Sequence, residues 1–336
     1  KDNSKTIQKI EEILYEDAPI AVGKGQVVKE GFHNELDELR NLLSDAKSVL
    51  LDIQKGSSSS AASKLLENRD LIISDFLFNL YMRILATDKS IKAGEYLIEK
   101  SESIYSYAKK FSKGPTFQRK LTLLPGMTLH EIYNLRNQEG IVNDLGTDPE
   151  AYLNKINIPY KEGVFFPDTY FFQKGDSYSS ILEKAHEKWK LEFLPLWHSR
   201  NKNLPYANLM EAITLASIIE KEGLEKNKIA GVFINRLSKK MKLQSDPTVI
   251  YALGKDFDGD IKRKDLQIDN PYNTYKNKGL PPGPISIVSK SSLIASLNPL
   301  QSDYLYFVSM GNGFHKFSKN LTEHNEAVLK YQINAR

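Results

Sequence analysis

Two glutamates near the end of a predicted helix, Glu220 and Glu222, could perform acid–base chemistry. On a helical wheel at roughly 100° per residue, Glu220 continues an apolar stripe, whereas Glu222 falls on another side. An ionised carboxylate facing the core is costly, so burial should raise the pKa of Glu220 towards neutrality. A carboxyl with such a pKa can act as a general acid at physiological pH. The pattern equally allows Glu220 to turn to solvent or to pair with Lys221 or Arg236.

Polar groups suited to sugar binding follow this helix in the chain. Gln244 and Asp246 belong to a Gln-Ser-Asp-Pro-Thr segment beside an apolar run. Further on, Tyr272, Asn273 and Tyr275 combine flat apolar faces with groups that form hydrogen bonds. Two plainer interpretations stay open. Ser-Asp-Pro-Thr is also a common start of a helix, and with 17 tyrosines in the chain two in one loop prove little.

Several other chemistries lack their motifs in this sequence. The absence of cysteine excludes disulfides, thiolate zinc sites and cysteine nucleophiles. The six histidines form no His-Glu-x-x-His pair, and no phosphate-binding glycine loop is present. There is no Gly-x-Ser-x-Gly elbow, and the Ser-x-x-Lys pairs lack their companion motifs. We therefore expect no metal and no cofactor.

The composition is that of a globular chain with an uneven charge. Its 336 residues, 40% of them hydrophobic and 26% charged, are enough for about two domains. No stretch approaches the roughly 18 apolar residues that would span a bilayer. The chain begins with Lys1, so a missing leader is uninformative. Residues 200–336 carry 20 Lys and Arg against 13 Asp and Glu, which suits an anionic partner as well as ordinary surface scatter.

A unit of strand, turn, hydroxyl residue and amphipathic helix recurs in the first half. It is clearest at residues 49–66 and 121–135, and looser at 94–111 and 170–186. A hydroxyl can accept a hydrogen bond from an unpaired amide of the first helical turn, and glycine favours the turn. Unless the recurrence is chance, such units build small α+β modules. Residues 1–48 are polar, with helix-like pieces at 6–15 and 33–46.

The second half is predicted to be mainly helical. Helices are expected over residues 208–221 and 228–239 and from residue 291 onward. An apolar strand over residues 304–308 should return through a Gly-Asn-Gly turn to residues 315–317. A last helix carries Glu323, His324 and Asn325.

Seven motifs occur in an order that is typical of one protein family. They are Glu162-Gly-Val-Phe-Phe-Pro-Asp-Thr-Tyr170, Ala216-Ser-Ile-Ile-Glu-Lys-Glu222, Val232-Phe-Ile-Asn-Arg-Leu237, Met241-Lys-Leu-Gln-Ser-Asp-Pro-Thr-Val-Ile-Tyr251, Tyr272-Asn-Thr-Tyr275, Gly279-Leu-Pro-Pro-Gly-Pro-Ile285 and Tyr304-Leu-Tyr-Phe-Val308. Together they resemble the MltG (YceG-like) endolytic murein transglycosylases of bacteria. The match runs from about Val49 to Tyr331 and leaves residues 1–48 outside it.

The resemblance implies an architecture and a location. It implies an α+β protein with a LysM-like module over residues 49–115 and a YceG-like catalytic domain over residues 116–336, and the polar composition of residues 1–48 indicates an N-terminal extension before them. It also implies a single membrane anchor preceding Lys1, which would place the catalytic domain on the outer side of the cytoplasmic membrane. The implied partners are peptidoglycan glycan strands and cell-wall synthases, with no nucleic acid.

The same resemblance implies the chemistry. The catalytic acid would be Glu220, the first Glu of Ile218-Ile-Glu-Lys-Glu222. It would cleave the β-1,4 bond between N-acetylmuramic acid and N-acetylglucosamine in nascent strands, leave 1,6-anhydro ends and so limit strand length. The residues implied in substrate binding are Gln244, Asp246, Tyr272, Asn273, Tyr275, Glu162 and Asn325, with Asp168 and Asn235 as weaker candidates.

One carboxyl would suffice because the lytic reaction consumes no water. A hydrolase usually needs two carboxyls, whereas here the acid could later take back a proton from the sugar's own C6 hydroxyl. On this reading Glu220→Gln should abolish cleavage and Glu222→Gln should be much milder. Two alternatives remain: a non-catalytic peptidoglycan-binding scaffold, and a hydrolysing muramidase that uses Asp246 as second carboxylate.

Overall fold

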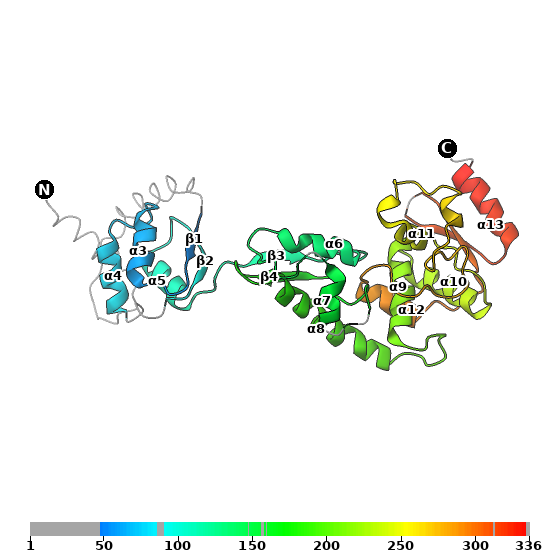
Figure 1. Ribbon diagram of the computed structural model, residues 1–336, viewed down its shortest axis with the longest axis horizontal. Coiled ribbons are helices and arrows are strands. Elements are labelled where there is room, and N and C mark those ends of the chain that lie inside the picture. Colours follow the sequence, from blue (N-terminus) through cyan, green and yellow to red (C-terminus); the bar gives the residue numbers. More distant parts are fainter. Residues whose placement is uncertain are drawn as a thin grey trace, which may run out of the picture. The chain divides into compact units, whose positions relative to one another are not determined.

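The computed structural model describes residues 48–85, 91–146, 148–155, 158, 160–311 and 313–333. The chain forms two compact units, Lys1–Arg119 and Lys120–Arg336, and each is considered by itself. Helices and strands are mixed in both units, as predicted (Figure 1). The helical pieces expected at residues 6–15 and 33–46 lie outside the described residues. Within the described ranges, no helix has the length and apolar character needed to cross a membrane.

Two antiparallel strands and three helices make up the described part of the first unit, from residue 48 onward. Strand β1 (Val49–Ile53) pairs with β2 (Gly94–Ile98), and the helices α3 (Ser59–Glu67) and α4 (Asp75–Ile84) lie between them in the chain. Helix α5 (Ile104–Lys113) follows β2. Its Phe111 is fully buried and meets the ring of Tyr96 edge-on, with the centroids 5.1 Å apart. The apolar faces of both strands and all three helices therefore share one core.

A capping hydroxyl starts each of the four helices in the recurring unit. Ser58, Ser103, Thr128 and Ser177 accept a hydrogen bond from the backbone amide three residues later, at the starts of α3, α5, α6 (Leu129–Asn134) and α8 (Tyr178–His198). Strands β3 (Arg119–Thr122) and β4 (Thr169–Phe172) precede the last two. The hydroxyl residue of each recurring unit therefore caps the helix that follows it, as predicted.

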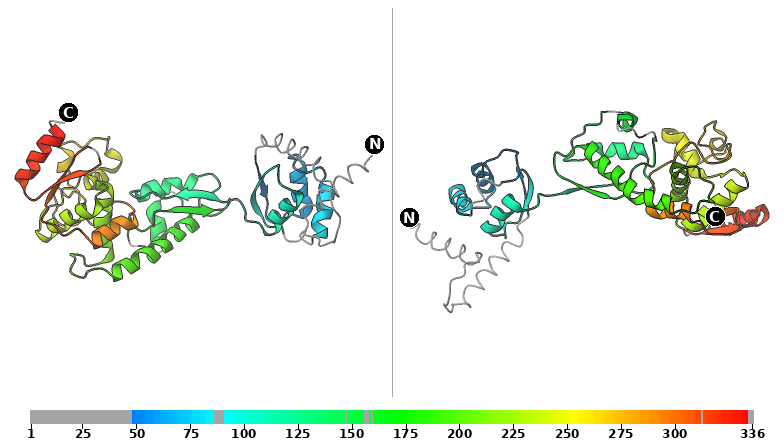
Figure 2. Two further views of the ribbon diagram at one scale, coloured as in Figure 1. Left: turned by 180° about the vertical axis from the view of Figure 1, so that it is seen from behind. Right: turned by 90° about the horizontal axis from the view of Figure 1, so that it is seen from below.

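The second unit begins with the two-stranded β3–β4 sheet. Helices α6 and α8 both lie alongside this sheet (Figures 1 and 2). A short 3-10 turn (Leu135–Asn137) and α7 (Pro149–Lys155) connect α6 to the segment before β4. The buried Tyr178 donates its hydroxyl to the carbonyl of Ile132, which joins α8 to α6.

Helix α9 (Leu209–Glu222) is the central element of the second unit. It contacts α10 (Lys226–Ser238), α11 (Asp246–Leu253) and α12 (Lys290–Leu297), as Figure 1 shows. From Met210 to Ile219 every residue except Glu211 is buried, so the middle of the helix has no solvent face. Beyond Ile219, the last turn leaves the core, with Glu220 and Glu222 half-buried and Lys221 exposed.

The C-terminal part of the second unit is a hairpin followed by a helix. Strands β5 (Tyr306–Ser309) and β6 (His315–Ser318) pair antiparallel, and α13 (Leu321–Val328) and a π-helical turn (Leu329–Ile333) follow them. Two 3-10 turns (Gly254–Asp256 and Asp265–Gln267) lie in the loop after α11. Strand β5 starts two residues later than predicted, because Asn235 Nδ2 of α10 binds the carbonyl of Tyr304 at 2.9 Å.

Candidate active site

Glu222, the last residue of α9, lines a groove of about 590 Å³. The walls come from α10, the segment before α11, the Tyr275 loop, the β5–β6 hairpin and α13. They present polar side chains that include Arg236, Gln244, Asp246, Tyr275, Tyr306 and Asn325. Such a wall of donors, acceptors and aromatic faces suits a polyhydroxylated ligand.

The surroundings of Glu222 favour its protonated form. Burial raises its pKa to about 7, and the nearby charge of Asp246 acts in the same direction. A hydrogen bond from Ser245 Oγ to Oε1, at 2.5 Å, and the charge of Arg236 oppose this rise without cancelling it. Glu222 therefore titrates near neutral pH, as a general acid requires.

The two oxygens of Glu222 differ in their contacts. Ser245 occupies Oε1, while Oε2 has no hydrogen-bond partner within the described part of the chain. One oxygen is thus held in place and the other is available to a ligand in the groove.

Tyr275 and Asp246 form a second polar contact in the groove. The Tyr275 hydroxyl donates to Asp246 Oδ1 at 2.5 Å, although the two residues are far apart in the chain. Burial and the adjacent carboxylate raise the pKa of Tyr275, so the phenol keeps its proton. Asp246 lies in the first turn of α11, where the helix dipole stabilises a negative charge.

Arg236 supports the floor of the groove from α10. Its guanidinium donates to the carbonyls of Leu305 at 2.6 Å, Leu243 at 2.8 Å and Lys242 at 3.1 Å. It also contacts Gln244 Oε1 at 3.3 Å. The side chain is buried, with 7% exposed. Arg236 therefore ties the start of β5 to the segment that carries the groove's polar residues.

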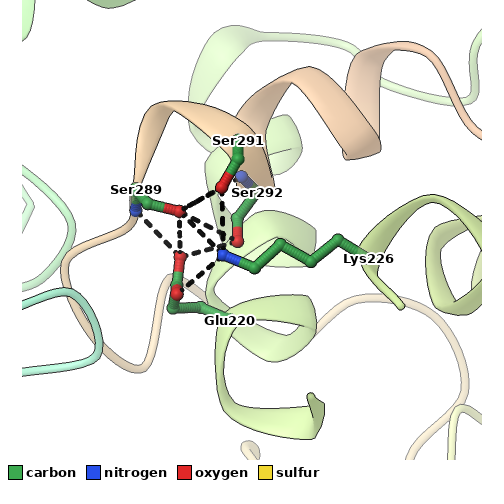
Figure 3. A network of polar contacts seen from close by, with 5 residues as sticks. All are labelled: Glu220, Lys226, Ser289, Ser291 and Ser292. Carbon is green, nitrogen blue, oxygen red and sulfur yellow. Dashed lines mark hydrogen bonds and ion pairs between the residues drawn. The ribbon is translucent and has the colours of Figure 1, made fainter. Parts of the chain in front are cut away.

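Glu220 has a different role in the structure (Figure 3). Lys226 Nζ lies 2.9 Å from Oε1, while the backbone amide and the hydroxyl of Ser289 donate to Oε2 at 2.9 and 2.5 Å. Ser292 Oγ also donates to Oε2, at 2.6 Å. Both carboxylate oxygens are thus occupied by groups of α12 and by the lysine that opens α10.

These contacts contradict the expected acidity of Glu220. Burial alone would raise its pKa, but the hydrogen bonds from Ser289, Ser292 and Lys226 outweigh burial and lower it. The predicted rise towards neutrality is therefore wrong. Pairing with a base, the alternative that the sequence left open, is what the structure contains, with Lys226 as partner in place of Lys221 or Arg236.

Glu220→Gln should lower the free energy of unfolding at pH 7 by about 1–3 kcal/mol, because charge-assisted hydrogen bonds are lost. A lowered folded-state pKa means that the stabilisation is complete above about pH 4.5 and disappears as the pH falls through the folded-state value. Urea unfolding at pH 7 and at pH 3 measures this. The difference in free energy of unfolding between wild type and variant should be smaller at pH 3 than at pH 7. An equal difference at both pH values would contradict a charge-based role.

Five of the predicted substrate-binding residues do not line the Glu222 groove. Asn273 is fully buried, and its amide donates to the carbonyls of Leu266 and Ile268 at 3.1 and 2.9 Å. Its Oδ1 accepts from the backbone amide of Tyr275 at 3.0 Å, so Asn273 positions that tyrosine. The ring of Tyr272 packs on Tyr251, with centroids 4.8 Å apart.

Two more of these five residues are the weaker candidates. Asp168 is paired with Lys188 and accepts from the amide of Thr169 at 2.7 Å, as a residue that stabilises a turn would. Asn235 donates to backbone carbonyls before β5. Glu162 also lies away from the groove, since it lines a separate cavity of the same unit. Gln244, Asp246, Tyr275 and Asn325 are the predicted residues that the fold brings together with Glu222.

Two residues that the sequence did not single out as binding groups support the groove: Arg236, which lines it, and the buried Ser245, which contacts Glu222. Ser245 lies between two predicted residues, and Arg236 lies in one of the seven motifs. Both could have been found by asking which motif residue could contact a buried carboxyl. The rings of Tyr306 and His324 stack with their centroids 5.2 Å apart. This contact between β5 and α13 is one that no local pattern indicates.

Comparison with known proteins establishes the family. The model described as the YceG-like family matches residues 51–330, and the chain belongs to this family. A protein named endolytic murein transglycosylase from Bacillus subtilis is 37% identical over 312 residues, which cover 85% of this chain and 86% of that protein. The predicted family resemblance is confirmed.

Two further similarities agree with this result. A protein of the same name from Streptococcus pneumoniae strain D39 is 29% identical over 343 residues, 90% of this chain, and the matched part is 62% of that protein's length. A crystal structure of a yceG-like protein from Listeria monocytogenes has 32% identity and a TM-score of 0.52, covering 83% of this chain and 98% of the other.

Proposed function

We propose that this protein is an endolytic murein transglycosylase, a lyase that cuts peptidoglycan glycan strands with Glu222 as its catalytic acid. The observation that carries the proposal is a carboxyl with a pKa of about 7 and one free oxygen, lining a groove of about 590 Å³. The relatives that bear this name, at 37% and 29% identity, support the same activity. Nothing in these relatives favours a non-catalytic scaffold.

The reaction follows from one carboxyl that gives and then regains a proton. Glu222 would protonate the oxygen that links N-acetylmuramic acid to N-acetylglucosamine, and the bond to C1 of the muramyl sugar would break. The muramyl 2-acetamido group would stabilise the cationic centre. The C6 hydroxyl would then close on C1 and return its proton to Glu222, so the product ends in 1,6-anhydro-muramic acid and no water is consumed.

Each neighbour of Glu222 has a part in this scheme. Ser245 would hold the carboxyl by Oε1 so that the free Oε2 carries the proton. Gln244, Asn325 and the Tyr275–Asp246 pair would bind hydroxyl and acetamido groups of the sugars. Glu220 would fix α9 against α12, which keeps the last turn in place without taking part in the chemistry.

The first unit is proposed to be a LysM-like module. Its support is the order of β1, α3, α4 and β2 with the two strands paired antiparallel. Together with a catalytic domain over residues 116–336, such a module would place the enzyme on growing glycan strands outside the cytoplasmic membrane, where cutting limits strand length. An anchor before Lys1 and contacts with cell-wall synthases stay predictions.

A hydrolysing muramidase is the second candidate, because Asp246 lines the same groove as Glu222. A second carboxylate could activate water or attack C1. Mass spectrometry of the products from uncross-linked glycan separates the two, since hydrolysis adds one water to each cut. Anhydro ends are the expected result, and reducing ends would assign the chain to the hydrolases.

The rate of strand cleavage should fall above pH 7. Glu222 has to be protonated in the free enzyme to act as an acid. Because its pKa is about 7, kcat/KM should decrease as the pH rises through about 7. Asp246→Asn removes a negative charge that raises this pKa, so the midpoint should move to lower pH. A pH–rate profile of both proteins tests this, and a midpoint that stays in place would count against Glu222 as the titrating acid.

A further inference from the structure

A second cavity of about 720 Å³ lies in the same unit as the groove. We call it the Glu162 cavity and define it by Leu129, Glu162, Lys221, Pro247, Tyr251 and Lys255. Its residues come from the segment before β4, which carries Glu162, and from the start of α6, the last turn of α9, α11 and the turn after it. None of these six residues lines the Glu222 groove.

Residues that are neighbours in the chain line the two cavities. On α9, Lys221 lines the Glu162 cavity and its neighbour Glu222 lines the groove. On α11, Pro247 lines the Glu162 cavity and its neighbour Asp246 lines the groove. Consecutive Cα atoms are about 3.8 Å apart, so both hollows border the same two helix ends. A ligand with two branches could therefore place one in each.

Three lysines, Lys161, Lys221 and Lys255, line the Glu162 cavity against the carboxylates of Glu131 and Glu150, so its lining carries a small positive charge when Glu162 is uncharged. Lys161 is paired with Glu150 at 2.8 Å, whereas Lys221 and Lys255 have no carboxylate partner among the residues that the structure describes. Both of these lysines are exposed. Two ammonium groups without partners can bind anionic groups of a ligand.

Glu162 does not cancel these charges. It is 6% exposed and accepts a hydrogen bond from the amide of Leu129 at 2.8 Å. The Tyr251 hydroxyl lies 3.4 Å from its other oxygen. Burial raises the pKa of Glu162 to about 8, so at neutral pH it is mostly uncharged. Leu129, Pro247, Ile250 and Ile285 add an apolar wall.

We propose that the Glu162 cavity binds the stem peptide of the muramyl residue whose bond is cut at Glu222, with Lys221 and Lys255 pairing with the peptide's carboxylates. The inference rests on the proposed function. In peptidoglycan the stem peptide is attached to the muramyl sugar, combines free carboxylates with alanine methyl groups, and so matches cations beside an apolar wall. A neutral sugar chain would gain little from two unpaired lysines.

Binding can be measured without any cleavage. The probes are synthetic stem tetrapeptides, with either lysine or diaminopimelate as third residue, and the same peptides with amidated carboxylates, titrated calorimetrically into the full chain. Amidation, and the double variant Lys221→Ala/Lys255→Ala, should each weaken binding about 3- to 10-fold. Lys184→Ala, an exposed lysine of α8 outside both cavities, should bind as wild type.

Kinetics give a second readout. The ratio of kcat/KM on peptide-bearing glycan to kcat/KM on glycan stripped by an amidase should fall about 3- to 10-fold in the double variant and stay unchanged in Lys184→Ala. An unchanged ratio in the double variant, or peptides that bind equally well after amidation, would overturn the cavity's assignment. If wild type cleaves neither glycan, the proposed function fails, and the titration still decides whether the cavity binds peptide.

Discussion

Glu222→Gln should reduce strand cleavage by about 10²- to 10⁴-fold, the usual contribution of a general acid. Gln keeps the shape of the side chain and can still accept the hydrogen bond from Ser245, but it cannot give a proton to the glycosidic oxygen. Release of anhydro-muropeptides from uncross-linked glycan, followed by liquid chromatography and mass spectrometry, measures the loss. A thermal melt close to that of wild type would show that folding is intact.

The matched control is Glu220→Gln, two residues away on the same helix. It should retain most of the activity and lose stability, because its carboxylate contacts Lys226 and two serines and not the groove. The opposite result, an inactive Glu220→Gln with an active Glu222→Gln, would restore the assignment that the sequence favoured. Equal loss in both would mean that the two carboxyls act together.

The stability of Glu222→Gln adds an independent check on its acidity. The folded-state pKa is raised to about 7 from an ordinary 4.5, so wild type loses stability as the pH rises between these values. Gln has no proton to lose. Relative to wild type the variant should therefore become more stable from pH 5 to pH 8, and the absence of this trend would contradict a raised pKa.

Arg236→Met should lower the free energy of unfolding by about 3 kcal/mol or more. Methionine fills part of the space, but the carbonyls of Lys242, Leu243 and Leu305 lose their donor in a largely buried site, and each such loss costs about 1–3 kcal/mol. The midpoint of urea unfolding measures the effect. Cleavage should fall as well, because Gln244 and the start of β5 lose their common support.

Arg263→Met serves as the comparison, since this arginine is exposed in the loop after α11. It should leave the unfolding midpoint within the error of measurement. A wild-type midpoint for Arg236→Met would show that these carbonyls find other donors, and the support role of Arg236 would then be wrong.

Local signals in the sequence predicted where several helices start, but they missed α4 and α7 and ended α8 near residue 186, although it continues to His198. Caps such as Ser177 and Thr128, and the helix start at Ser245-Asp-Pro, act within one turn, so spacing alone reveals them. The choice between Glu220 and Glu222 was different. A helical wheel identifies the buried face of a helix only when the opposite face is exposed to water. Helix α9 is buried on all sides from Met210 to Ile219 apart from Glu211, so the wheel could not tell which glutamate is buried.

The composition of the groove depended on contacts between distant segments. The sequence identified Asn273 and Tyr275 as similar candidates, yet one is fully buried beneath the loop and the other contacts Asp246. Glu162 belongs to the same ordered series of motifs as the groove residues, but it lines a different cavity. Residue type and order therefore predicted which side chains were candidates for substrate binding. Tertiary packing decided which of these candidates line the same groove.

The residue that ends α9 limits how this protein can be altered. Gly223 has a φ of +155°, and a Cβ there would lie 2.9 Å from Cε1 of His315 on β6. Because the helix stops against this ring directly after Glu222, adding or deleting one residue in its last turn would rotate the carboxyl by about 100°. A circular permutation that opens the chain at residue 223 would remove this constraint on the position of the Glu222 carboxyl.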